Sequence, residues 1–392
     1  MDNSIILDLV LGTILAVTVI GRLVTMARVV IPYQTLPRVG DAPPMEDGPD
    51  CSILIPVRDE AETIGPCLAS LSDQSYRRLE ILVVDDDSSD GTARVVEEAA
   101  IRDGRIRYLR APQLPAGWTG KNFALAWGAE KVRGTWLLFT DADTVHAPSA
   151  LARALGYAQA QNLACLSLTP EQECWTFWER VVQPVVCDLL DQTYPLAEVN
   201  KPTSSCAAAH GAFLLIRREV YETVGGHGQL RGELLEDVAL ARAVKERGEP
   251  LCFAPGTGLV RSRMYRSFGH LREGWTKNLY LLMGGRPGRA LRAAAALLWT
   301  GCVPALAFLT FAGLAVAGMT SSRLLPWALS VAALLLASEG LFRRARGHDP
   351  LFAWSYPLGV LVVVVFLLES VYRNLSGRGV TWKARVYAGG SS

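Results

Sequence analysis

The sequence lacks paired cysteine motifs and lacks net charge, and both absences exclude classes of protein. Its eight cysteines are scattered and none forms a CxxC pair, so neither a zinc ribbon nor a disulfide framework is expected, and we interpret them as reduced thiols. The formal net charge is +1, which gives no indication of a nucleic-acid partner. Apolar residues make up 50% and charged residues only 20%, which is apolar for a wholly soluble protein.

A cleavable leader is also not expected, although the chain begins with an apolar run. The start, MDNS, has no positive charge, and no A-x-A site follows the run Ser4–Ala27. That run is about long enough for one membrane-spanning helix, so we expect a retained anchor over residues 1–30. Three further runs predict transmembrane or interfacial helices over residues 286–375, followed by a basic tail, residues 376–392. They are Ala290–Met319, Leu324–Phe342 and Ala353–Val371.

Basic residues beside the apolar runs set the expected orientation. Arg22, Arg28 and Arg38 trail the first run, so the positive-inside rule places the central region in the cytoplasm. Three C-terminal crossings would put the basic tail on the other side, against the rule. We expect either that one run lies flat or re-enters, or that the tail breaks the rule. The interrupted run Ala290–Met319 is favoured for an interfacial position.

Residues 48–285 alternate short apolar runs with amphipathic segments. Strands are predicted over Cys51–Val57, Leu79–Val84, Arg105–Leu109 and Thr135–Thr140. Helices are predicted over Glu62–Ser72, Ala93–Ile101 and Ala124–Arg133. This alternation predicts an α/β domain in which a mostly parallel sheet has helices on both faces. Ligands bind such sheets beyond the carboxyl ends of the strands.

Acidic side chains collect at three of these strand ends. The residues are Asp59 and Glu60 after the first strand, Asp85, Asp86 and Asp87 after the second, and Asp141 and Asp143 after the fourth. We assign Asp90 and Ser88 to turn formation. The remaining carboxylates repel one another unless a cation neutralises them. An Asp-x-Asp at a strand end suits Mg²⁺ or Mn²⁺, which prefer oxygen ligands and accept phosphate oxygens as well.

Several motifs, in order, resemble those of the inverting family-2 glycosyltransferases, which have a GT-A nucleotide-sugar fold. They are IPVRDEAETI, VVDDDSSDGT, FTDADTVHAP and LLEDVALARAVKERG, between Cys51 and Trp275. Three more segments resemble, more narrowly, the hopene-associated and carotenoid glycosyltransferases of bacteria, with ceramide glucosyltransferase more distant. These segments are GWTGKNFAL, MYRSFGHLREGWTKNLY and WKARVY. The resemblance implies an enzyme of the bacterial inner membrane with a cytoplasmic catalytic domain and a UDP- or GDP-sugar donor.

The resemblance also implies roles for individual residues. Arg58 and Glu60 would lie beside the base and ribose of the donor, and Asp86 would contact the base. Pro56 and Asp85 belong to the same donor-binding set, and Lys121 would add a positive charge at the diphosphate. Asp143, shared with Asp141, would ligate a divalent metal there, and Asp141 would also reach the ribose.

Asp237 matches the catalytic base of the family. An inverting transfer needs a carboxylate to remove the proton of the acceptor hydroxyl, and Glu236 would ligate or orient. An acidic pair at the start of a helix over Val238–Arg247 is the structural alternative, and both can hold for the same residues.

One family motif is incomplete. Many processive members place an arginine directly before a tryptophan, whereas this chain has Gly274 before Trp275, which argues against a polysaccharide synthase. Trp275 would close over the acceptor or anchor the chain at the membrane interface. Four residues complete the expected acceptor and diphosphate region or its surroundings: Arg263, Arg272, His210 and, less favoured than a simple turn residue, His146.

Three hypotheses follow. The leading one is a membrane enzyme that moves a sugar from a nucleotide-diphosphate sugar to the hydroxyl of a lipid, of isoprenoid, carotenoid, hopanoid or other type. A second is a polyprenyl-phosphate sugar synthase, whose anionic acceptor has less need of Asp237. A third, a non-catalytic membrane scaffold, is disfavoured because Asp143 and Asp237 are both present. A transporter is disfavoured because Asp8, Glu339 and Glu369 lie near helix ends, where they can snorkel.

Overall fold

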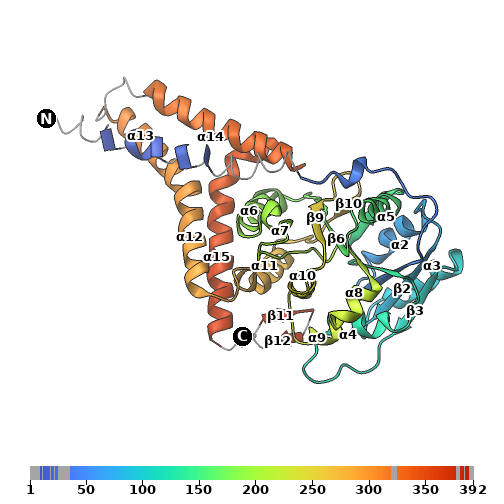
Figure 1. Cartoon of the computed structure of the whole chain (residues 1–392). Helices are drawn as coiled ribbons and strands as arrows, with labels where there is room; N and C mark the ends of the chain where they lie inside the picture. Colours follow the sequence, from blue (N-terminus) through green and yellow to red (C-terminus); the bar gives the residue numbers. More distant parts are fainter. Residues whose placement is uncertain are drawn as a thin grey trace.

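The structure is a computed structural model that describes residues 9–10, 12–17, 19–21, 23–24, 36–318, 325–376, 380–383 and 385–387. Figure 1 shows an α/β domain beside a group of long helices, with the N-terminal segment along the far helices. The predicted α/β class is confirmed. The described residues of the first apolar run are helical, and Leu15 packs with α13 (Val303–Val316) and α14 (Leu325–Ala345).

Seven strands form the central sheet, in the order β3-β2-β1-β4-β8-β6-β9. They are β1 (Cys51–Val57), β2 (Leu79–Asp85), β3 (Ile106–Arg110), β4 (Trp136–Phe139), β6 (Cys165–Thr169), β8 (Leu214–Arg217) and β9 (Leu251–Pro255). The four predicted strands are therefore confirmed to within a residue or so at each end. β8 runs antiparallel to β4 and β6, and the other pairs are parallel. Because β2, β1 and β4 are parallel neighbours, their carboxyl ends meet at one edge.

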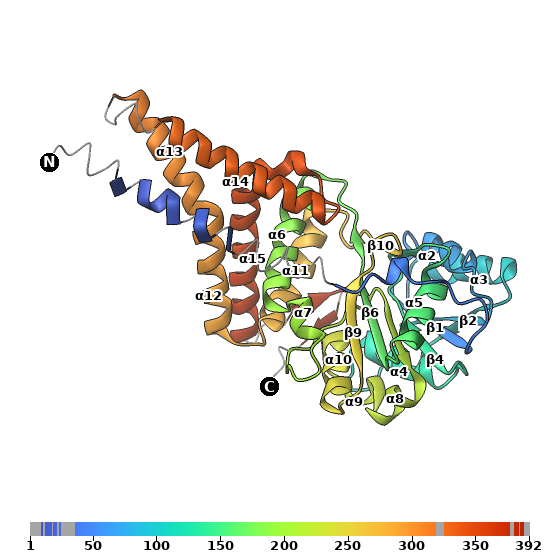
Figure 2. The ribbon, with the colours of Figure 1, turned by 45° about the horizontal axis from the view of Figure 1, so that its top comes forward.

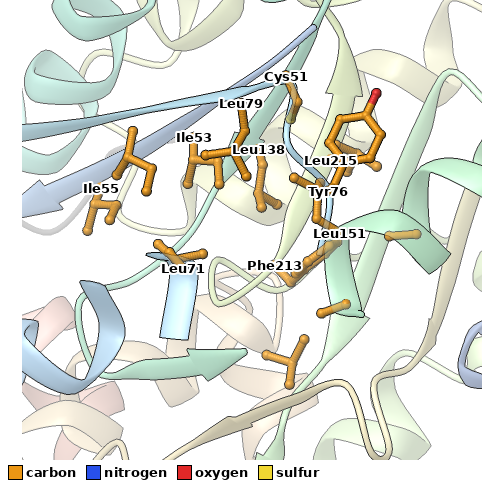
Figure 3. Packing of buried hydrophobic residues seen from close by; sticks show 14 of the residues in the cluster. Cys51, Ile53, Ile55, Leu71, Tyr76, Leu79, Leu138, Leu151, Phe213 and Leu215 are labelled. Atoms are coloured by element: carbon orange, nitrogen blue, oxygen red, sulfur yellow. The ribbon is translucent and has the colours of Figure 1, made fainter. Parts of the chain in front are cut away.

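Both faces of the sheet are buried, which explains the uninterrupted apolar strands. Ile53 and Ile55 of β1 face α2 (Ile64–Ser72), α3 (Thr92–Arg102) and α5 (Ala150–Ala160). Leu54, between them, faces the opposite cluster, with α4 (Gly120–Ala129) and α10 (Glu236–Glu246). Figure 3 shows the first cluster, with Ile53, Ile55, Leu71 and Leu138 packed together.

Helix α4 begins four residues before its predicted start. Thr119 caps it, since its side chain accepts a hydrogen bond from the Asn122 N–H at 3.3 Å. The helix therefore includes Lys121, and its first turn lies against the carboxyl edge of the sheet. The apolar pattern that located the helix begins only at Ala124, so it could not reveal this turn.

Short elements surround the carboxyl edge. A second sheet, in the order β5-β10-β7, contains β5 (Thr144–His146), β10 (Val260–Ser262) and β7 (Glu171–Gln172). It ties the chain after Asp143 to the strand that precedes α11 (Phe268–Leu282). Three short helices complete the domain: α7 (Leu196–Val199), α8 (Arg218–Thr223) and α9 (Gly226–Gln229). Strands of two or three residues leave too little pattern for prediction from sequence.

The long helices dock on the α/β domain through α6 (Phe177–Thr193) and α11. Helix α15 (Tyr356–Leu375) packs against both and against α12 (Pro287–Leu297), which lies beside it in Figures 1 and 2. Helix α12 continues through a π-helical turn, η2 (Leu298–Cys302), into α13 (Val303–Val316). The helical path therefore runs past Pro304 without a break, and the π-helical turn lies just before this proline.

Two of the predicted apolar runs form helices long and apolar enough to cross a membrane, Pro287–Val316 and Pro350–Leu375. The third run forms α14 (Leu325–Ala345), followed by η4 (Pro350–Ser355). The expectation that Glu339 snorkels to a surface is wrong. Glu339 and Arg343 are buried together and form an ion pair at 2.8 Å, because each supplies the partner that burial of a charge requires.

The C-terminal tail returns to the α/β domain. Strands β11 (Val380–Trp382) and β12 (Arg385–Tyr387) form a two-stranded hairpin, and Lys383 donates to the backbone carbonyl of Arg58 at 2.6 Å. The described residues of the tail therefore contact the turn after β1 directly.

The close approach of α15 to α6 depends on Gly359. A Cβ at this position would overlap the carbonyl oxygen of Val181 and lie 2.9 Å from Cγ2 of Val185. We expect Gly359→Ala to lower the free energy of unfolding of the purified protein by about 1–3 kcal/mol, the usual effect of overpacking. Thermal unfolding would measure the change.

The matched control is Gly313→Ala in α13, where a newly added Cβ would have no atom within 4 Å. Alanine stabilises a helix relative to glycine by about 1 kcal/mol, so this variant should unfold at or above the temperature of the parent. Equal unfolding temperatures for Gly359→Ala and the parent would contradict the role of Gly359.

Candidate active site

A cavity of about 410 Å³ opens at the carboxyl edge where β1, β2 and β4 end. Its wall on the sheet side includes Pro56, Arg58, Glu60, Asp86, Asp141 and Asp143. Asp237 at the start of α10 also lines it, with apolar side chains from α6 and α11 on the other wall. The carboxylates that follow the strands therefore lie together at one cavity wall, as the sequence predicted.

The turns after β1 and β2 hold each other in place. Arg58 donates to the Asp86 carbonyl at 2.6 Å, and the Asp59 N–H donates to Ser88 Oγ at 3.0 Å. Asp90 accepts from the N–H groups of Ala61 and Thr92 at 3.0 and 2.9 Å. Ser88 and Asp90 thus have the turn-forming contacts expected of them.

Only one of the three aspartates after β2 lines the cavity. Asp85 accepts from the Ser88 N–H and the Tyr108 hydroxyl, both at 2.7 Å, and so lies beneath the turn. Asp87 forms an ion pair with Arg110 at the surface. Asp86 faces the cavity and is paired with Arg385 of the C-terminal hairpin. Asp85 was predicted to bind the donor, but the structure places it under the turn.

Lys121 connects two of the predicted carboxylates. Its Nζ lies 2.7 Å from Asp141 Oδ1 and 2.6 Å from Glu236 Oε1. Burial favours the neutral form of Asp141, yet the ammonium of Lys121 holds the pKa of Asp141 below its usual value. Gly211 makes room for this group, since its Cβ would lie 2.9 Å from Lys121 Nζ.

Asp143 is the carboxylate that most lacks a positive partner. Burial and the nearby carboxylates of Asp141 and Glu60 raise the pKa of Asp143 to about 7. Within the described ranges, no cation forms an ion pair with Asp143, and no group of three or more His, Cys, Asp or Glu side chains is arranged to hold a metal. Asp143 and Asp141, the pair predicted to hold an ion, are therefore not joined by a third such ligand in the described part of the chain.

Asp237 is held by two backbone groups. Its Oδ2 accepts from the Gly211 N–H at 2.9 Å and its Oδ1 from the Val238 N–H at 2.8 Å. Burial and the neighbouring Glu236 raise the pKa of Asp237 to about 7. A carboxylate with a pKa near neutral pH, fixed at the wall of a cavity, has the properties of a general base.

The residues predicted for the acceptor side divide into two groups. Trp275 and His210 line the cavity, and Trp275 donates to Gln183 at 2.6 Å. Arg263 instead pairs with Glu179 at 3.0 Å and stacks on Trp175, and Arg272 pairs with Glu369 of α15 at 2.9 Å. Neither arginine is part of the cavity wall.

His146 lies in the interior rather than at the cavity. It is buried in β5, where its Nε2 lies 3.1 Å from Thr140 Oγ1 and its ring packs near Phe213. Burial lowers the pKa of His146 to about 3, so the imidazole stays neutral. Its contacts are those of a structural histidine.

Sequence reasoning missed many of the residues that line the cavity. Among them are Lys277, Asn278, Arg346, His348 and Lys383. Burial lowers the pKa of Lys277 to about 8, and Arg346 pairs with Asp188 of α6 at 2.6 Å. Three of these five lie in segments that carry the family resemblance: Lys277 and Asn278 lie in the segment around Trp275, and Lys383 lies in WKARVY.

Comparison with known proteins agrees with this geometry. The family model described as glycosyl transferase family 2 matches residues 52–225. A 4,4'-diaponeurosporenoate glycosyltransferase of Staphylococcus haemolyticus (strain JCSC1435) is 28% identical over 271 residues, 68% of each chain. The protein of the same description from Staphylococcus aureus (strain USA300) is 26% identical over 346 residues, 86% of this chain and 88% of the relative.

Among solved structures, a mannosyltransferase from Pyrobaculum calidifontis in complex with GDP-Man and Mn²⁺ has a similar fold. Its TM-score is 0.56 at 18% sequence identity, over 94% of this chain and 99% of the other. The resemblance seen in the motifs is thereby confirmed. The chain contains a glycosyl transferase family 2 domain over residues 52–225 and has a GT-A fold, and its relatives support transferase activity.

Proposed function

We propose that this glycosyltransferase moves a sugar, with inversion, from a nucleotide-diphosphate sugar to the hydroxyl of an apolar lipid at a membrane surface. The observation that supports this most is the shape of the cavity. One continuous space joins the carboxylate edge to apolar side chains of α6 and α11, among them Leu190, Trp275 and Leu282. Asp237 lines this same space.

The long helices support a membrane location. Leu306, Leu309 and Val316 of α13 are 61%, 64% and 91% exposed, and a folded protein seldom leaves so much apolar surface to water. Exposed Phe177 and Trp354 lie in one aromatic cluster beside η4. Aromatic residues of this kind concentrate at the membrane–water interface. The enzyme would thus lie against the membrane that holds its acceptor.

The names of the relatives support a lipid-like acceptor. Those relatives are named for 4,4'-diaponeurosporenoate, and the name denotes a carotenoid carboxylate. We therefore propose an acceptor of isoprenoid type for this chain. An anionic acceptor, whether carboxylate or polyprenyl phosphate, is the second candidate, and Lys277 and Arg346 on the cavity wall favour it.

Different residues of the cavity have different proposed roles in the transfer. Asp237, oriented by the Gly211 and Val238 N–H groups, accepts the proton of the acceptor hydroxyl as its oxygen attacks the anomeric carbon. Lys121, fixed between Asp141 and Glu236, holds a positive charge near the position proposed for the diphosphate. Arg58, Glu60 and Asp86 line the end proposed for the nucleoside.

The carboxylates of Asp143 and Asp141 are suitable ligands for a divalent metal. Mg²⁺ and Mn²⁺ commonly bind through one or two carboxylates together with substrate phosphates and water, so Asp143 with Asp141 would suffice once a diphosphate is present. Such an ion would neutralise the negative charge that develops on the nucleoside diphosphate as it leaves.

Transfer of label from radioactive UDP- or GDP-sugars to extracted lipids, with purified enzyme in lipid vesicles, tests the function. We expect Asp237→Asn to lower the rate of transfer to a hydroxyl acceptor by about 10²- to 10⁴-fold, the usual contribution of a general base. Donor binding should persist, because the amide keeps the shape of the side chain.

Glu97→Gln, an acid exposed on α3, is the matched control and should transfer at the parental rate. If Asp237→Asn retains most activity on an anionic lipid, the second candidate is correct. No label in any lipid with the parental enzyme would reject the proposal.

The metal has its own test in Asp143→Asn. We expect this variant to bind Mn²⁺ in the presence of UDP or GDP at least about tenfold more weakly, because the loss of a single supporting group already costs metal sites tenfold or more. Electron paramagnetic resonance of free Mn²⁺ measures the affinity directly. Unchanged affinity would remove Asp143 from the metal site, and Glu97→Gln serves again as the control.

The contacts of the tail predict its side of the membrane. A fluorescent protein fused after residue 392 should fluoresce in bacterial cells, and alkaline phosphatase at the same point should be inactive, because both would be cytoplasmic. Phosphatase fused after Gly318, beyond the first long apolar helix, should be active. Active phosphatase at residue 392 would contradict the topology.

A further inference from the structure

The C-terminal hairpin, residues 380–387, occupies an unexpected place in the structure. It follows the last long helix, yet it lies beside α11 near the carboxyl edge of the sheet (Figure 1). Its two described basic side chains, Lys383 and Arg385, both point to residues that line the cavity. Along the chain they lie 323 and 299 residues from Glu60 and Asp86, their respective partners.

Lys383 joins the turn after β1. Its ammonium donates to the Arg58 carbonyl at 2.6 Å and forms an ion pair with Glu60. The side chains of Lys383 and Glu60 are 26% and 22% exposed, so the pair is largely shielded from water. Exposed pairs contribute little to stability, whereas a shielded charge needs a partner. Lys383 itself is part of the cavity wall.

Arg385 joins the turn after β2. Its guanidinium pairs with Asp86, which is 9% exposed, and lies so close to Gly120 that a Cβ there would overlap it. Arg385 and Asp86 thus both lie against the first turn of α4, which presents Lys121. The two basic side chains of the hairpin reach the ends of β1 and β2 separately, one turn each.

Lys383, in the turn of the hairpin, has an unfavourable backbone conformation. Trp382 pairs with Arg385, so the loop has two residues, and its first residue, Lys383, has a φ of 46°. Asparagine or glycine usually occupies such a position, because a Cβ disfavours the left-handed region. Strain of this kind recurs at functional sites, where other contacts hold the residue in place.

We propose that the C-terminal hairpin forms one wall of the donor site, with Lys383 and Arg385 as positioning residues for a bound nucleoside diphosphate. The inference rests on the proposed function and deepens it. Lys383 and Arg385 fix the carboxylates of Glu60 and Asp86 toward the cavity. They also supply positive charge at an edge where strand-end carboxylates would otherwise repel the diphosphate.

The experiment measures the Kd of UDP and of GDP, at fixed Mn²⁺, for full-length enzyme in lipid nanodiscs by titration calorimetry. For the nucleotide that the parental enzyme prefers, we expect Arg385→Ala and Lys383→Gly each to raise the Kd about tenfold, which corresponds to the loss of one charge-assisted contact. In transfer assays the KM for the donor should rise by the same factor, while the KM for the lipid stays unchanged.

The Lys383→Gly variant distinguishes the effect of the lost positive charge from the effect of a misfolded hairpin. Glycine relieves the strained turn, so the hairpin should form at least as well as before while its cation is gone. Arg385→Lys, which keeps the charge, should restore part of the affinity. Arg373→Ala is the matched control: this arginine lies near the end of α15 and pairs with Glu369, away from the cavity, and its Kd should equal that of the parent.

Two outcomes would overturn the proposal. Unchanged nucleotide affinity in both hairpin variants would leave the hairpin with a structural role only. Tighter binding would show that the hairpin competes with the donor. Either result in an enzyme that still glycosylates lipid leaves the proposed function standing, whereas a parental enzyme that binds neither nucleotide would reject both.

Discussion

Repulsion among carboxylates at one sheet edge is the constraint on which the rest of the structure depends. Parallel neighbours β2, β1 and β4 deliver their carboxyl ends to the same place, so Glu60, Asp86, Asp141 and Asp143 share one cavity wall. Like charges this close raise one another's pKa values unless cations intervene. Lys121 forms ion pairs with Asp141 and Glu236, and the two basic side chains of the C-terminal hairpin form ion pairs with Glu60 and Asp86. Asp143 has no ion-pair partner among the described residues, and this is why we propose a divalent cation for it.

This constraint joins the helical part of the chain to the catalytic part. Helix α15 packs on α6 and α11, whose inner sides line the cavity, and its end leads into the hairpin that reaches the ends of β1 and β2. Arg272 of α11 and Arg373 both pair with Glu369 of α15. The position of the long helices therefore sets the distance between the apolar wall of the cavity and its carboxylate edge.

The sequence was sufficient for the parts of this arrangement that follow local rules. Continuous apolar runs located β1 to β4, because buried parallel strands need them. The motifs located Asp86, Asp141, Asp143 and Asp237 on one cavity wall. The sequence was not sufficient for contacts between distant segments. Nothing local to Lys383 indicates Glu60 as its partner, and neither the charge of the tail nor its WKARVY motif placed it at the cavity. Arg263 and Arg272 were predicted for the acceptor and diphosphate region, but they form ion pairs with carboxylates of α6 and α15.

The departure from the family motif before Trp275 has a steric reason. A Cβ at Gly274 would overlap the ring of Tyr265, which packs against Trp275 with centroids 5.6 Å apart. An arginine at this position would therefore displace Tyr265 from the cavity wall. Lys277, three residues later and on the same side of the helix, lines the cavity instead. The positive charge that α11 presents to the cavity therefore lies about one turn farther along the helix. The buried hydrogen bond between Trp275 and Gln183 fixes α11 against α6.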